Sequence, residues 1–178
     1  MSFLSKLLGT QPDPRDEVRS LWHKTVEIAR QPDWYARCGV ADTVDGRFDM
    51  ITAALSVVTV RLEASNLRRE SALIAEFFVE DMDGQLREFG VNDVVVGKRV
   101  GRLMGVLGGR LGAYRAAIDN RDEARLIAAV ARNVSFADAE SATAEGAASS
   151  QVAAGLLALS DRLAALDDTA LLAADFPA

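Results

Sequence analysis

Apolar residues recur at every third or fourth position along each long stretch of this sequence, and this spacing strongly constrains the fold. In an α-helix such residues share one face, because successive residues are about 100° apart. The repeats cover residues 14–30, 47–67, 71–89, 96–118 and 152–166. Part of the second repeat is rich in Val and Thr and is also compatible with a strand, but it continues a long helical pattern. The sequence therefore predicts an all-α helical bundle of about six to eight helices.

The length of 178 residues, 49% of them apolar, favours a single domain with a substantial core. We expect an N-terminal segment over residues 1–13 and a helical domain over 14–135. A stretch rich in Ala, Ser, Glu and Gly predicts a linker or loop over 136–150. A further apolar repeat predicts a C-terminal helical segment over 151–178 that packs on the domain.

Charge and composition argue against several functions. The net charge of −6 argues against DNA binding. With one cysteine, Cys38, and one histidine, His23, the chain offers no internal disulfide, no His/Cys zinc cluster and no evident catalytic triad. We therefore expect no catalytic residue, no metal and no cofactor. The sequence contains no stretch of 18 consecutive apolar residues, so we expect no membrane-spanning helix. Residues 3–8 form a small amphipathic segment that suits a membrane surface.

The predicted helix over 96–118 carries three different faces. One face is apolar. A second carries five glycines, and a third is basic. A glycine within a helix costs about 1 kcal/mol relative to alanine, so five on one face need a reason. Two remain open: a tight packing seam against another helix of the chain, or a groove that accepts a partner helix. The glycines are Gly97, Gly101, Gly105, Gly108 and Gly112, and the basic residues are Lys98, Arg99, Arg102 and Arg110.

Three aspartates, Asp42, Asp45 and Asp49, precede or open the predicted helix over 47–67. Their spacing contains only fragments of a calcium-binding loop. Helix capping explains them better. We expect Asp45 or Thr43 to accept the free N–H groups at the start of the helix, and Asp49 to lie in its first turn.

Acidic residues also flank the apolar face of the predicted helix over 71–89. Asp83 and Arg87 are spaced for an i,i+4 ion pair. Asp81 and Asp83 are also the residues that a metal-dependent enzyme would use, but the chain shows no second acidic motif of this kind. A solvated acidic rim is the simpler interpretation.

Three segments together resemble the ubiquinol–cytochrome c chaperone family. They are ARQPDWYARCGVADTVDGRFDMI (29–51), FFVEDMDGQLREFGVNDVVVGKRV (77–100) and the spaced GR and AY of residues 109–114. The resemblance covers residues 28–118 and implies an all-α protein that assists the biogenesis of cytochrome b and the assembly of the bc1 complex. The motif positions that it marks are Asp42, Asp45, Gly46, Arg47, Asp49, Asp81, Asp83, Arg87, Gly97 and Lys98.

We therefore expect a non-enzymatic assembly chaperone for newly synthesised cytochrome b. The resemblance also implies a ribosome or membrane surface and a small co-chaperone as further partners. The expected location is cytoplasmic, with a peripheral position on the inner face of the cytoplasmic membrane. Two alternatives are an all-α enzyme acting on a lipid or isoprenoid, and a plain helical scaffold for a soluble partner. The candidate partner-binding residues are Trp34, Tyr35, Arg47, Asp81, Asp83, Lys98, Arg99 and Arg102.

Overall fold

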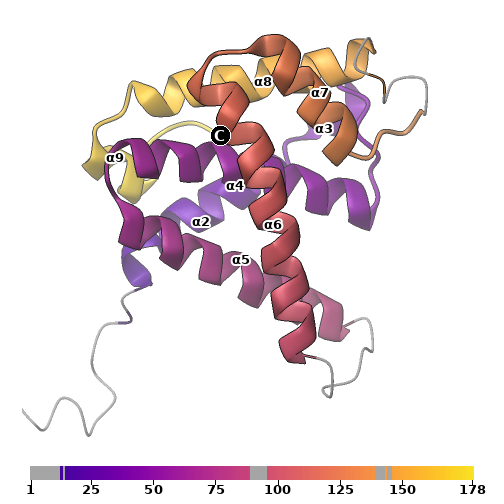
Figure 1. Cartoon of the computed structure of the whole chain (residues 1–178). Helices are drawn as coiled ribbons and strands as arrows, with labels where there is room; N and C mark the ends of the chain where they lie inside the picture. Colours follow the sequence, from indigo (N-terminus) through magenta and orange to yellow (C-terminus); the bar gives the residue numbers. More distant parts are fainter. Residues whose placement is uncertain (1–12, 14, 89–95, 139–142, 144–145) are drawn as a thin grey trace, which may run out of the picture.

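The computed structural model describes residues 13, 15–88, 96–138, 143 and 146–178, with only the backbone at 83, 85–88 and 96–104. The described residues form a helical bundle with no β-strand, apart from an isolated bridge between Val40 and Phe136 (Figure 1). The all-α prediction is confirmed, and eight helices lie within the expected range. They are α2 (Asp16–Ala29), α3 (Pro32–Ala36), α4 (Val44–Ala64), α5 (Arg68–Glu88), α6 (Val96–Asp119), α7 (Glu123–Asn133), α8 (Ala147–Ala164) and α9 (Asp168–Ala173).

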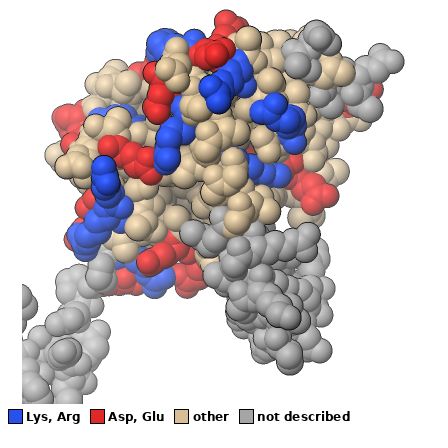
Figure 2. All heavy atoms as spheres, viewed as in Figure 1, with Lys and Arg blue, Asp and Glu red and all other residues tan. Residues whose placement is uncertain are grey.

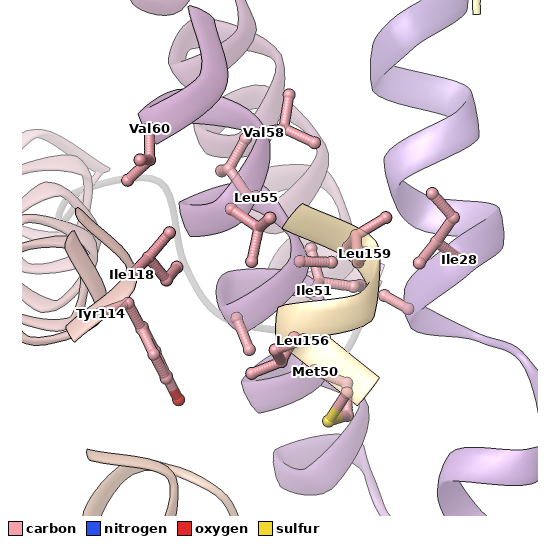
Figure 3. Packing of buried hydrophobic residues seen from close by; sticks show 14 of the residues in the cluster. Ile28, Met50, Ile51, Leu55, Val58, Val60, Tyr114, Ile118, Leu156 and Leu159 are labelled. Carbon is pink, nitrogen blue, oxygen red and sulfur yellow. The ribbon is translucent and has the colours of Figure 1, made fainter. Parts of the chain in front are cut away.

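Helix α4 is the centre of the bundle. It packs against α2, α5, α6 and α8, and 14 of its 21 residues are buried. Figure 3 shows Leu55 and its neighbours on α4 packed among side chains that include Ile28 of α2, Ile118 of α6 and Leu159 of α8. Because the middle of α4 is buried on every side, packing lets its Val and Thr residues adopt a helix that isolated propensity would not favour.

Polar side chains of α4 form hydrogen bonds both within the helix and to the end of α8. The buried Thr52 donates its hydroxyl to the Phe48 carbonyl, and Ser56 donates to the Thr52 carbonyl, each over 2.7 Å. At the other end, Arg61 reaches across to the end of α8 and donates to the carbonyls of Leu163 and Leu166 over 2.9 and 2.7 Å. These contacts remove the cost of burying unpaired donors and join the C-terminal helices to the core.

The segment between α7 and α8 is only partly a loop. Ala41 N–H donates to the Ser135 carbonyl and Ala137 N–H donates to the Gly39 carbonyl, so this connection is tied to the chain entering α4. Helix α8 begins at Ala147, so the last four residues of the expected 136–150 linker are helical instead. The Ala-rich start of α8 has no capping side chain, which explains why its beginning was hard to locate.

Candidate functional site

The start of α4 is shaped by the aspartate- and glycine-containing segment. The Thr43 hydroxyl accepts the Gly46 N–H over 3.1 Å, so Thr43 is the N-cap and Asp45 is exposed in the first turn. A side chain at Gly46 would overlap the Ala41 carbonyl oxygen, so only glycine fits here. Asp42 accepts the Arg47 Nε–H over 2.7 Å, and this guanidinium lowers the pKa of the Asp42 carboxyl. The family motif therefore sets the geometry of this entry turn.

The aromatic pair on α3 anchors that helix to the end of α2. Trp34 donates its indole N–H to the Ile28 carbonyl over 2.7 Å, and Tyr35 donates its hydroxyl to the Ala29 carbonyl over 2.8 Å. The Trp34 ring lies against α8, where a side chain at Gly155 would approach it to 2.5 Å. Trp34 is therefore mainly a packing residue, whereas Tyr35 stays half-buried beside solvent.

Tyr35 and Arg47, two of the predicted partner-binding residues, lie together at a surface hollow. The hollow has a volume of about 600 Å³ and is lined by Arg30, Pro32, Tyr35, Ala36, Asp42 and Arg47. Its volume falls within the range of about 300–1,000 Å³ that is usual for ligand sites. This is a concave site that the family motif helps to build.

Asp49 has a role that the sequence did not predict. It lies in the second turn of α4 rather than the first, and it is only 5% exposed. Its carboxylate accepts Arg110 of α6 over 2.6 Å, and the hydroxyl and N–H of Ser135 over 2.7 and 2.9 Å. Arg110 also lies over the Phe48 ring, with 5.3 Å between the guanidinium carbon and the ring centroid. Asp49 therefore joins α4, α6 and the segment after α7.

Arg110 does not belong to the predicted basic face. It is three residues after Leu107 and four before Tyr114, both of which are buried, so it lies beside the packed side of α6. Burial raises the pKa of the Tyr114 phenol despite the opposing charge of Arg110. The buried side of α6 thus includes a paired cation, which a purely apolar stripe does not reveal.

The glycine face of α6 is open to solvent where its surroundings are described. Gly105, Gly108 and Gly112 are exposed, and an added Cβ at each meets nothing within 4 Å. An internal packing seam with any other described helix is therefore wrong for these three glycines, because no described residue lies within 4 Å of the added Cβ. The groove alternative stays a prediction. Figure 2, in the same view as Figure 1, shows an uncharged strip over the middle of α6 with charged side chains around it.

Two residues of the acidic rim on α5 bind other side chains of the protein. Asp81 accepts the indole N–H of the buried Trp22 over 2.6 Å, and Glu80 pairs with Arg15 over 2.5 Å. Phe77 lies beneath the guanidiniums of Arg15 and Arg19. These contacts join α5 to the start of the chain that the structure describes, so Asp81 has a structural role.

Several predicted residues lie outside the described side chains: Asp83, Arg87, Gly97, Lys98, Arg99, Gly101 and Arg102. The amphipathic segment over 3–8 also lies outside the described residues. Within the described part of the chain, no cluster of three or more His, Cys, Asp or Glu residues is arranged to hold a metal ion. None of the helices described there combines the length and apolarity needed to cross a bilayer.

Sequence reasoning missed Arg30 and Ser135, which take part in the hollow and in the Asp49 network. Ser135 is isolated in a loop, and only the fold brings it to Asp49. Arg30 carried a weak signal as the last residue of the first predicted helix, two positions before the helix-breaking Pro32, and a cation there is usually explained by the helix dipole. The motif positions themselves were informative: Gly46, Arg47 and Asp49 each make a specific contact.

Comparison with known proteins agrees with this architecture. The family model described as ubiquinol–cytochrome C chaperone matches residues 36–178, so the similarity continues well past residue 118, where the sequence motifs end. A search of curated proteins finds no match. The crystal structure of the Cbp3 homolog from Brucella abortus is similar, with a TM-score of 0.78 and 30% sequence identity, over 98% of this chain and 94% of that chain. By these criteria, the chain belongs to the ubiquinol–cytochrome c chaperone family.

Proposed function

We propose that this protein is a non-enzymatic chaperone that binds newly made cytochrome b and supports assembly of the ubiquinol–cytochrome c reductase (bc1) complex. Family membership supports the assembly role. The observation that supports client binding is the open glycine face of α6, where Gly105, Gly108 and Gly112 are exposed and no described residue lies within 4 Å of an added Cβ. A client with apolar helices needs a surface that its backbone can approach closely, and glycine permits that approach.

The same helix explains how a client would be oriented. Lys98 and Arg102 are four residues apart on α6, so they share one side of the helix. Their charges would meet a partner at the edge of the glycine face and would influence its encounter and register more than its affinity. A ribosome or membrane surface and a small co-chaperone, which the family resemblance implies, would be further partners of this assembly step.

The contacts of the acidic residues favour this function over the lipid-enzyme alternative. That alternative uses Asp81 and Asp83 as ligands of a divalent metal. Asp81 instead directs one carboxylate oxygen to the Trp22 indole, which locks it between α2 and α5. The motif carboxylates Asp42 and Asp49 are likewise paired with arginines, which suits a structural role.

The proposed function is tested by capture of cytochrome b from native membranes with a tagged chain. We expect cytochrome b to co-purify, and deletion of the chaperone to lower the cellular amount of bc1 complex. The double change Lys98→Glu with Arg102→Glu should weaken capture while thermal melting is nearly unchanged, because we expect both charges on the surface, where an ion pair contributes only about 0–1 kcal/mol to stability. Undiminished capture would remove this basic side from the binding surface. Saturable binding of magnesium or manganese with lipid turnover would favour the enzyme instead.

A further inference from the structure

The hollow beside α3 is lined by a guanidinium, that of Arg30, for which the described residues provide no ion-pair partner. Among the described residues, no carboxylate pairs with Arg30, which is exposed. It is not needed to cap α2 either. The last carbonyls of that helix already accept the Trp34 indole N–H and the Tyr35 hydroxyl. Arg30 therefore presents its N–H donors to the hollow without a structural reason.

Arg47, which also lines the hollow, uses only part of its guanidinium within the chain. Its Nε–H donates to Asp42 over 2.7 Å, and the described residues provide no partner for its two terminal nitrogens. Both arginines lie close enough to the Tyr35 hydroxyl to oppose the rise in its pKa that burial causes. Two guanidiniums thus line the same hollow as Tyr35, and the described residues leave N–H donors of each without a partner.

The residues that line the hollow carry a net positive charge, whereas the whole chain carries a net negative charge. Arg30 and Arg47 outnumber the single carboxylate, Asp42, although the protein as a whole carries −6. The rest of the lining is formed by Pro32, Tyr35 and Ala36. A planar guanidinium with free donors matches a carboxylate in geometry as well as charge.

An exposed apolar side chain, that of Val44, lies near this site. Val44 is 63% exposed, the highest value for a large apolar residue in the described part of the chain. It is three residues before Arg47 on α4, so the two share one side of the first turns. A bound segment that places a carboxylate between the arginines could therefore cover Val44 with an adjacent apolar side chain.

We propose that this hollow binds an Asp or Glu side chain of a protein segment whose neighbouring apolar residue covers Val44. The proposal rests on the proposed function only in assigning that segment to the client. A protein segment fits this hollow better than a membrane surface, because Arg30 and Arg47 line one small concavity instead of a broad basic face. The site would therefore recognise one acidic residue of the partner.

The first test uses small probes and the full chain. We titrate N-acetyl-glutamyl-leucine amide against the ¹⁵N-labelled protein, with N-acetyl-glutaminyl-leucine amide as the neutral control. The backbone amides around Tyr35 and Val44 should shift saturably with the acidic probe and about tenfold more weakly with the neutral one. Arg30→Gln should weaken the acidic probe by a similar factor and leave thermal melting unchanged. Equal binding of both probes, or no shift, overturns the proposal. Tighter binding of inorganic phosphate at equal ionic strength also overturns it, in favour of a phosphate site.

The second test uses the client. Arg30→Glu should lower capture of cytochrome b, whereas Arg68→Glu, an equal charge reversal at the exposed start of α5, should not. Figure 1 shows that α5 begins at the end of the bundle opposite α3. If wild type captures cytochrome b and Arg30→Glu captures it equally well, the hollow does not bind the client. The inference about the hollow then fails, and the proposed function stands. If wild type captures none, the proposed function fails, and the probe titration still decides whether the hollow binds a carboxylate.

Discussion

Helices α4 and α6 both contain many residues that disfavour isolated helices, but the two helices differ in how these residues are packed. In α4 these are Val, Thr and Ser, and packing on every side compensates for their low propensity. In α6 they are glycines, and at Gly105, Gly108 and Gly112 no described residue packs against them. The cost of the α4 residues is therefore recovered within the fold. The cost of the α6 glycines is not, which is why we assign stability to α4 and partner binding to α6.

The largest expected effect lies where the two helices meet. Asp49→Ala should lower the free energy of unfolding by about 3–5 kcal/mol, because it leaves the Arg110 guanidinium without its partner in a largely buried position. Urea denaturation measures the change. Asp45→Ala is the matched control, since Asp45 is exposed in the first turn and should cost less than about 1 kcal/mol. Similar values for the two variants would show that the Asp49 pair does not hold α4 to α6.

The next prediction compares the cores of the two helices directly. Leu55→Ala should cost about 2–5 kcal/mol, because Leu55 is fully buried on α4 and its truncation leaves a cavity. Leu111→Ala on α6 should cost clearly less, because Leu111 is only partly buried. Both are measured by chemical denaturation. Equal losses would contradict the view that α4, rather than α6, is the centre of the fold.

The helical pattern of the sequence was sufficient to predict the all-α class, because apolar side chains must share a face to be buried together. It did not identify the central helix. Helix α4 is buried on all sides, so its apolar residues are not confined to one face and its amphipathic signal is weak, whereas the glycines made α6 more conspicuous. The Asp49 contacts with Arg110 and Ser135 join positions 61 and 86 residues apart in sequence. Only the crossing of α4 and α6 and the path of the chain after α7 bring them together.

A smaller effect is expected at the entry to α4. Gly46→Ala should cost about 1–3 kcal/mol, because its Cβ would overlap the Ala41 carbonyl and displace the turn before the helix. Gly84→Ala on α5 is the control, since an added Cβ there meets nothing within 4 Å. The two melting temperatures should move in opposite directions. A neutral Gly46→Ala would mean that the entry turn moves without cost, and the geometry of the adjoining hollow would then be less constrained than we infer.

The smallest effect has the opposite sign and separates stability from function. Gly108→Ala should raise the free energy of unfolding by about 0.5–1 kcal/mol, because alanine is the better helix former and the added methyl group meets no neighbour. If the face accepts a client helix, the bulkier Gly108→Leu should keep a stability close to wild type and lower the capture of cytochrome b, because its side chain occupies the space that the client backbone would enter. Thermal melting and co-purification measure the two properties on the same preparations. A destabilised Gly108→Leu would show that the face is more closely packed than its exposure indicates. A stable Gly108→Leu that captures the client fully would move the binding surface away from this part of α6, and the hollow beside Tyr35 would become the next surface to test.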